Sequence, residues 1–228
     1  MIGTLYGVGV GPGDPELLTL KAVRIIKECD IIAIPALDKH TCVAFHIAQK
    51  AIPELDEKEI LPIDMPMIKD KVLLKQSHEQ GAYLITEQLQ KGKNIAFLTL
   101  GDPTIYSTYI YIHRLVKESG HQTEIISGIP SFCAVAATLG DSLVDKAELL
   151  HIIPSSYSIS ESISLSGTKV YMKAGKQIGE VKKQLQSNGF DAVMVENCGM
   201  SNEKIYPSVE DIPEDAGYYS LIISKESK

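Results

Sequence analysis

A glycine-rich turn close to the start of the chain is the feature that most constrains the fold. Residues 4–14 read Thr-Leu-Tyr-Gly-Val-Gly-Val-Gly-Pro-Gly-Asp. A short apolar strand, a glycine turn and a following helix are typical of the dinucleotide-binding loop of an α/β fold. The spacing does not fit that function, because G-x-G-x-x-G counted from Gly7 or Gly9 requires glycine where Pro12 and Asp14 stand. We therefore expect the turn to bring the backbone close to something other than a pyrophosphate.

Two other signs of nucleotide binding are absent. The acidic residue that binds a ribose should close the second strand, about 20 residues after the glycine motif, but Asp30 opens that strand. No Gly-Lys-Ser/Thr follows the glycines, so the P-loop pattern fails as well. We interpret Asp14-Pro15 as a helix cap followed by a first-turn proline.

Composition restricts the class of partner. The chain has 228 residues, 44% hydrophobic residues and a formal net charge of −7, which argues against nucleic acid or an anionic membrane as the main partner. No apolar run reaches the roughly 18 residues of a membrane helix, and the chain begins with a strand pattern instead of a signal peptide. We therefore expect a cytoplasmic protein. A polyanionic small molecule would need clustered lysines, because the sequence contains only two arginines, Arg24 and Arg114.

The cysteines and histidines show no metal-binding or redox spacing. The cysteines contain no C-x-x-C pair and the histidines contain no H-x-H or H-x-x-x-H pair. We expect reduced structural thiols and no metal site built by the protein. The cysteines are Cys29, Cys42, Cys133 and Cys198, and the histidines are His40, His46, His78, His113, His121 and His151.

The first half of the sequence alternates strand and helix patterns. Repeated strand–helix units predict a parallel sheet covered by helices, with right-handed connections. We expect strands at 4–8, 30–35, 58–62 and 94–100, and helices at 15–28, 41–51, 69–91 and 104–118.

The pattern changes near Gly120, and the later strands follow one another closely. Part of a second sheet is therefore expected to be antiparallel, in a second α/β domain. We place the boundary at residues 118–121, which gives domains 1–119 and 120–228. We expect strands at 122–126, 149–153, 168–172, 191–197, 203–206 and 218–224, and helices at 131–139, 158–164 and 175–187.

Three strand ends carry the remaining motifs. In Leu98–Thr108 an apolar strand runs into Gly101-Asp102-Pro103, where open α/β sheets bind ligands. Asp102 either caps the next helix or binds a ligand. Ser127–Ala137 repeats the design, and its small residues serve either a flat ligand or close helix packing. Val170–Gly175 is a third strand end followed by glycine, where Met172 either lines a site or fills the core, and in the second case Lys173 is an ordinary surface lysine. No Ser-His-Asp arrangement or carboxylate dyad can be recognised, which favours a site that orients two activated small molecules.

Together these segments resemble the tetrapyrrole methylase family. Val8–Ala22 resembles the opening signature, and Gly101-Asp102-Pro103 resembles the second. Gly128-Ile-Pro-Ser-Phe132 and Val170-Tyr-Met172 follow in the family's order. The chain is most similar to the precorrin-2 carbon-20 methyltransferases of cobalamin synthesis, through Gly-Asp-Pro-Thr-Ile-Tyr-Ser-Thr, Tyr-Met-Lys-Ala-Gly-Lys and Tyr219–Ile223. A uroporphyrinogen enzyme more usually has Gly-Gly-Asp-Pro where this chain has Leu100-Gly-Asp-Pro.

The resemblance implies two α/β domains, a homodimer and S-adenosyl-L-methionine as methyl donor in a cleft between the domains. It implies that the first domain borders the tetrapyrrole site and that the second completes the donor cleft. The donor contacts that it implies are Leu100, Gly101, Asp102, Ile105, Tyr106, Ser131, Phe132 and Met172, with looser assignments at Asn197, Met200, Ser220 and Leu221.

The reaction implied is attack of an electron-rich carbon 20 on the sulfonium methyl, followed by loss of a proton. Asp102, Tyr106 and Lys173 are the candidate proton acceptors. Contacts with the carboxylate-rich substrate are expected from Gly11, Pro12, Lys21, Lys39, His40 and Lys176, with Lys173 also available as a cation. We interpret Lys69 and Lys71 as a solvated helix start. The Lys- and Ile-rich, Arg-poor composition favours cobalt-precorrin-2 over metal-free precorrin-2, and any cobalt would belong to the substrate.

Three alternatives remain open. One is another corrin-pathway or uroporphyrinogen methyltransferase with a different target carbon. The second is a nicotinamide-dependent oxidoreductase, which explains the glycine turn but not its spacing. The third is a tetrapyrrole carrier without catalytic activity.

Overall fold

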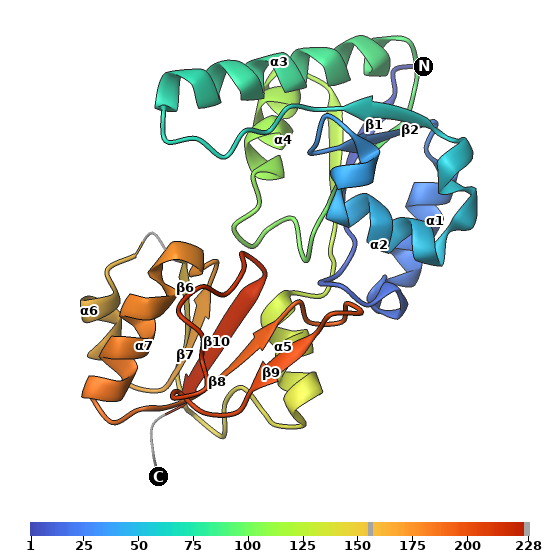
Figure 1. Cartoon of the computed structure of the whole chain (residues 1–228). Coiled ribbons are helices and arrows are strands. Elements are labelled where there is room, and N and C mark those ends of the chain that lie inside the picture. Colours follow the sequence, from blue (N-terminus) through green and yellow to red (C-terminus); the bar gives the residue numbers. More distant parts are fainter. Residues whose placement is uncertain (155–156, 226–228) are drawn as a thin grey trace. The chain divides into compact units, whose positions relative to one another are not determined.

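The chain folds into two compact units, Met1–Pro130 and Ser131–Lys228. The computed structural model describes residues 1–154 and 157–225 (Figure 1). We expected the boundary at residues 118–121. It lies after Pro130 because the strand at 122–126 pairs with the first strand of the chain and belongs to the first sheet.

The first unit contains the predicted all-parallel sheet. Its strand order is β3-β2-β4-β1-β5, and Leu5 of β1 lies opposite Ile95 on one side and Thr123 on the other. All five strands leave the sheet at the same edge. The strands are β1 (Thr4–Gly9), β2 (Ile31–Ile34), β3 (Glu59–Pro62), β4 (Ile95–Thr99) and β5 (Gln122–Ile126).

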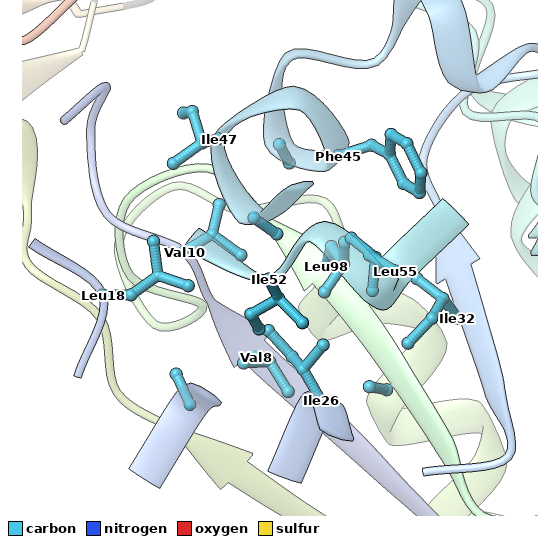
Figure 2. Close-up of a cluster of buried hydrophobic side chains, with 14 of the residues drawn as sticks. Val8, Val10, Leu18, Ile26, Ile32, Phe45, Ile47, Ile52, Leu55 and Leu98 are labelled. Atoms are coloured by element: carbon cyan, nitrogen blue, oxygen red, sulfur yellow. The ribbon is translucent and has the colours of Figure 1, made fainter. Parts of the chain in front are cut away.

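Helices cover both faces of this sheet. The helices α1 (Leu20–Glu28) and α2 (Val43–Ala51) lie on one side, and α3 (Lys71–Gln90) and α4 (Tyr109–Glu118) lie on the other (Figure 1). Ile32 packs in the first core and Ile31 in the second. The continuous apolar sequence of β2 follows from this burial on both faces. Figure 2 shows the first core, in which Val8, Ile26 and Leu98 meet.

Two predicted helices begin later than expected. Asp14 does cap a turn, since its carboxylate accepts a bond from the Glu16 N–H at 2.8 Å, but that turn is the short 3-10 helix η1 (Pro15–Leu17). The α-helix starts at Leu20, with Thr19 as its N-cap. The helix expected at 104–118 starts only at Tyr109, because Tyr106 has a positive φ of 47° that a right-handed helix cannot contain.

The second unit contains a mixed sheet, as predicted. Its order is β6-β7-β10-β8-β9, in which only the β6–β7 pair is parallel. The strands are β6 (Leu150–Pro154), β7 (Thr168–Met172), β8 (Asp191–Glu196), β9 (Lys204–Tyr206) and β10 (Ser220–Lys225), and the helices are α5 (Ser131–Leu139), α6 (Ile159–Ile163) and α7 (Ile178–Ser187).

The remaining helical segments are short. The 3-10 helices η2 (Lys39–Thr41), η3 (Pro53–Glu57) and η4 (Gly175–Gln177) lie in connections between strands and helices. Among the residues that the structure describes, no helix combines the length and the hydrophobicity that crossing a bilayer requires.

Candidate functional site

Four glycines join three strand ends of the first unit, and we call Gly9, Gly11, Gly101 and Gly128 the glycine junction. Gly101 donates its N–H to the Gly11 carbonyl at 2.8 Å and accepts from the Gly11 N–H at 3.3 Å. A Cβ added to Gly128 would lie 2.1 Å from the Gly101 carbonyl oxygen, and one added to Gly9 would lie 2.6 Å from it. The close backbone approach that the glycine turn predicted is therefore an approach to other backbone segments of the same unit.

Asp102 connects the loop after β4 with the loop after β5. Its carboxylate is buried and accepts from the Thr104 N–H at 2.7 Å through one oxygen and from the Gly128 N–H at 3.0 Å through the other. The helix-cap interpretation is wrong, because the next helix begins seven positions later at Tyr109. One carboxylate oxygen therefore binds the backbone of Gly128 in the glycine junction, and the other binds the backbone of Thr104 in the loop after β4.

The loop after β4 also carries a backbone conformation typical of functional sites. Tyr106 has a φ of 47° and a side chain that is 45% exposed. Such a conformation costs about 1–3 kcal/mol and persists only where the surroundings impose it. The Ser107 hydroxyl lies 3.1 Å from the Thr99 hydroxyl and accepts from the Tyr109 N–H, which anchors the loop at its far end. Leu100 and Ile105 in this loop are half-buried.

The second unit gathers most of its predicted donor contacts at one edge of its sheet. The strand β10 is antiparallel to β7 and β8, so its first residues lie beside their last ones. Met172 of β7 lies opposite Leu221 of β10, and Ser220 lies opposite Glu196 of β8. Met172, Leu221 and Ser220 are buried, whereas Glu196 is half-buried.

The turn after β8 brings two more predicted residues to the same edge. The Asn197 N–H donates to the Tyr219 carbonyl at 3.0 Å, and the Met200 N–H donates to the Asn197 carbonyl at 2.9 Å. Ser131 and Phe132 start α5, which packs against β10. The structure therefore groups Met172, Asn197, Met200, Ser220 and Leu221, which come from three separate segments of the sequence, whereas for Ser131 and Phe132 it shows only that their helix contacts β10.

Lys173 and Asn197 directly follow β7 and β8, and both have a positive φ, 56° and 54°. The Lys173 ammonium lies 5.9 Å from the centre of the Tyr218 ring. Burial lowers the pKa of Lys173. Lys173 is half-buried, so it is not the ordinary surface lysine that one interpretation of this strand end expected.

The residues predicted to bind the substrate do not share one kind of environment. Lys21 forms an ion pair with Glu124 at 2.6 Å, and Lys39 forms one with Asp56 at 2.8 Å. His40 is exposed. Gly11 and Pro12 are buried beside Gly101. The side chain of Lys176 lies outside what the structure describes.

Sequence reasoning missed the partners of Asp102. The Asp-Pro-Thr order contains a signal for the local bond, since an aspartate that accepts from the N–H two positions later forms a common turn. No sequence signal identifies the bond to Gly128, 26 positions away. In the part of the chain that is described, no three His, Cys, Asp or Glu side chains gather as a metal site.

Comparisons with known proteins agree with this architecture. The family model of the tetrapyrrole (corrin/porphyrin) methylases matches residues 4–213. The probable cobalt-precorrin-2 C(20)-methyltransferase of Methanocaldococcus jannaschii is 36% identical over all of this chain and 98% of its own length. The precorrin-2 C(20)-methyltransferase of a Sinorhizobium species is 29% identical over 97% of this chain and 95% of its own.

A solved structure shows the same fold. The uroporphyrin-III C-methyltransferase of Thermus thermophilus in complex with S-adenosylhomocysteine superposes with a TM-score of 0.74 at 21% identity, and the match covers 98% of each chain. With the family model matching most of its length, this chain belongs to the tetrapyrrole (corrin/porphyrin) methylases.

Proposed function

We propose that this enzyme transfers the methyl group of S-adenosyl-L-methionine to carbon 20 of cobalt-precorrin-2 or precorrin-2. The observation that carries the proposal is the full-length similarity to relatives named for methylation of that carbon. Leu100 before Gly101-Asp102 supports it over a uroporphyrinogen enzyme, which more usually has a glycine at that position.

The residues present fit the methyl donor. A Cβ at Gly101 would meet only the Ile129 carbonyl oxygen, 3.9 Å away, so the side of the backbone where a side chain would project is open. Gly101 also has a φ of 70°, which few other residues adopt. The open side lies in the same loop as the exposed ring of Tyr106. S-Adenosyl-L-methionine supplies an activated sulfonium methyl group when it is bound.

Each unit, taken by itself, carries residues that we propose as donor contacts. In the first unit, the glycine junction and Asp102 hold the loop after β4, so that its backbone groups are ordered before the donor binds. The contacts proposed in that loop are Leu100, Gly101, Asp102, Ile105 and Tyr106, and those proposed in the second unit are Ser131, Phe132, Met172, Asn197, Met200, Ser220 and Leu221.

Of the three candidate proton acceptors, Lys173 is the best suited to the chemistry. Burial lowers its pKa and so favours the neutral amine that can take a proton. Asp102 uses both carboxylate oxygens to hold backbone N–H groups, and we assign it a positioning role. Tyr106 remains a candidate contact to donor or substrate.

The test uses donor labelled in its methyl group together with precorrin-2 and cobalt-precorrin-2 under anaerobic conditions. The expected product carries one added labelled methyl at carbon 20, identified by mass spectrometry and NMR. A methyl group at another carbon would assign the chain to another corrin methyltransferase. Binding of NADH without binding of S-adenosylhomocysteine in a calorimetric titration would instead favour an oxidoreductase.

We also propose a homodimer in the cytoplasm. The family resemblance supports the dimer, and the buried thiols support a reducing compartment. Burial raises the pKa of Cys29 to about 12 and also raises that of Cys42, so both thiols stay protonated and structural. Light scattering in solution and cell fractionation test the two statements.

A further inference from the structure

The carboxylate of Glu196, the last residue of β8, binds two other segments of the second unit. One oxygen accepts from the Gly217 N–H at 2.8 Å, and the other accepts from the Tyr206 hydroxyl at 3.3 Å. Gly217 precedes β10 and Tyr206 ends β9, and these strands lie on either side of β8 in the sheet (Figure 1). Burial and the Glu196 carboxylate raise the pKa of Tyr206, so the phenol keeps the proton that it donates. The Glu196 side chain therefore connects the end of its own strand to both neighbouring strands.

The segment that Glu196 holds leads directly into donor contacts proposed above, and we call Gly217–Tyr219 the entry segment of β10. The Ser220 hydroxyl donates to the Gly217 carbonyl at 2.8 Å. The Asn197 N–H donates to the Tyr219 carbonyl at 3.0 Å. Two of the proposed donor contacts are therefore hydrogen-bonded to the entry segment, one at each end of it.

The backbone around Glu196 is constrained and closely packed. Asn197 follows it directly with a φ of 54°, a conformation that a residue other than glycine keeps only where its surroundings impose it. A Cβ added to Gly217 would lie 2.9 Å from the Glu196 Oε1 atom, so the carboxylate approaches the entry segment as closely as a glycine allows. The side chain of Glu196 and the N–H of Asn197 thus fix this segment from two consecutive residues.

The contact has a counterpart in the first unit. There the Asp102 carboxylate accepts from the Gly128 N–H at 3.0 Å and holds the loop that carries other proposed donor contacts. Glu196 forms no ion pair with any residue in the described part of the chain. Hydrogen bonds to neighbouring segments are therefore what the structure shows this carboxylate to make.

We propose that Glu196 is a positioning residue for the methyl donor, because its carboxylate holds the entry segment in the conformation in which Asn197 and Ser220 contact the donor. This inference rests on the proposed function and adds a residue to its donor site. Glu196 acts through the backbone of the entry segment, as Asp102 acts through the backbone of Gly128.

The test measures S-adenosylhomocysteine affinity by calorimetry and the KM values of S-adenosyl-L-methionine and of the tetrapyrrole. Each variant is studied where circular dichroism shows it to be folded. Glu196→Ala removes the acceptor of the Gly217 N–H, so the donor must order the entry segment itself when it binds. The affinity for S-adenosylhomocysteine should fall about tenfold, the size expected for one hydrogen bond to a charged group. The donor KM should rise by a similar factor, while the KM of the tetrapyrrole at saturating donor stays the same.

Two conservative variants separate the hydrogen bond from the charge. Glu196→Gln removes the charge and keeps an oxygen that can accept from Gly217, so it should bind S-adenosylhomocysteine as the wild type does. Glu196→Asp keeps the charge on a side chain that is one methylene shorter, so it should bind more weakly than Glu196→Gln. If the carboxylate instead attracted a positive group of the donor, the order of these two variants would be reversed.

Glu148→Ala is the matched control. The Glu148 carboxylate also accepts from one backbone N–H, that of Asp145 at 2.9 Å. Glu148 precedes β6, which is parallel to β7, so it lies toward the opposite edge of the sheet from Met172. Its removal should leave donor affinity unchanged, and a loss equal to that of Glu196→Ala would overturn the inference.

The remaining outcomes separate this inference from the proposed function. Unchanged donor affinity in Glu196→Ala, or a loss in Glu196→Gln as large as in Glu196→Ala, would overturn the positioning role if the wild type binds the donor and methylates the tetrapyrrole. A lower unfolding free energy in Glu196→Ala with unchanged donor affinity would likewise reduce Glu196 to a structural residue. A wild type that does not bind S-adenosylhomocysteine would overturn both proposals.

Discussion

The Asp102 carboxylate accepts a hydrogen bond from the Gly128 backbone N–H at 3.0 Å, and Gly128 in turn packs against the Gly101 carbonyl. Two loops that follow different strands are thereby fixed to each other at the edge where the candidate donor contacts of the first unit lie. The closeness of the approach depends on glycine, because a Cβ on Gly128 would collide with the backbone of the other loop. The arrangement holds the two loops of the candidate site in place. It explains the buried Asp102 carboxylate by its hydrogen bonds, with no role for Asp102 in proton transfer.

Replacing Asp102 with Asn should weaken this support. The NH₂ of the asparagine amide would point toward one of the two backbone N–H groups, that of Gly128 or that of Thr104. That N–H would then have no acceptor in a buried position. The expected loss is about 1–3 kcal/mol of unfolding free energy, with weaker S-adenosylhomocysteine binding. Denaturant unfolding and calorimetric titration measure the two effects.

Asp14→Asn is the control for this variant. Asp14 accepts one bond from Glu16 at an exposed, three-residue helix, and asparagine keeps an oxygen that can accept it, so the variant should cost less than about 0.5 kcal/mol. Equal destabilisation in the two variants would contradict the positioning role of Asp102.

Gly128→Ala tests the glycine junction directly. The new Cβ would lie 2.1 Å from the Gly101 carbonyl oxygen and 2.8 Å from the Gly9 carbonyl carbon, so the loops must separate. The expected cost is about 3 kcal/mol or more, measured by denaturant unfolding.

A matched glycine in a helix should respond in the opposite direction. Gly179 lies in α7, and a Cβ there would make only ordinary contacts with Glu214 at 3.9 Å. Gly179→Ala should stabilise the protein by about 0.5–1 kcal/mol. A Gly128→Ala variant as stable as the wild type would show that the junction is not close-packed.

Acid should destabilise the first unit through two histidines between α3 and α4. Burial lowers the pKa of His78, which stacks on Tyr111 with ring centres 5.0 Å apart, and burial is also the main cause of the lowered pKa of His113. The unfolded chain therefore binds protons first as the pH falls through about 6.5. Stability should decrease from that pH down to the lower pKa values of the folded state.

His78→Gln should make the acid dependence shallower, because one of the two groups responsible is removed. Unfolding free energies measured between pH 7 and pH 4.5 give the slope. His40→Gln changes an exposed histidine and should leave the slope as it is. The explanation fails if His78→Gln and the wild type have the same slope.

Lys173 should give a pH dependence at the alkaline end. Its pKa is lowered in the folded state by burial, so the unfolded chain binds the extra proton below about pH 10.5. The stability contribution of Lys173 should therefore rise with pH from the folded pKa to that value. Lys173→Met should flatten this rise in unfolding measurements, whereas Lys183→Met, at an exposed position of α7, should not.

The same variant tests the proton acceptor. Lys173→Met should lower the kcat of methyl transfer about 100-fold if the amine takes the proton. S-Adenosylhomocysteine affinity serves as the readout of folding and donor binding. A variant with normal kcat across the pH range would remove Lys173 from the reaction.

Much of the architecture was predictable from local patterns. The ten strands appear within two residues of their expected bounds, because alternation of apolar runs with Gly, Pro and Asp turns is encoded locally. The family signatures at Gly101 and Met172 also correctly indicated the fold and the class of reaction. The roles of the individual site residues remain predictions.

Local patterns did not reveal which distant segments meet. The sequence by itself determined the order of elements, the positions where glycine is required and the family. Only the tertiary structure decided that β5 joins the first sheet, that α4 begins after the positive φ of Tyr106 and that Asp102 binds Gly128. The physical reason is the sequence separation over which each effect acts. Strand propensity and turn chemistry act over a few residues, whereas strand order and the partners of a buried carboxylate depend on packing between segments far apart in the chain.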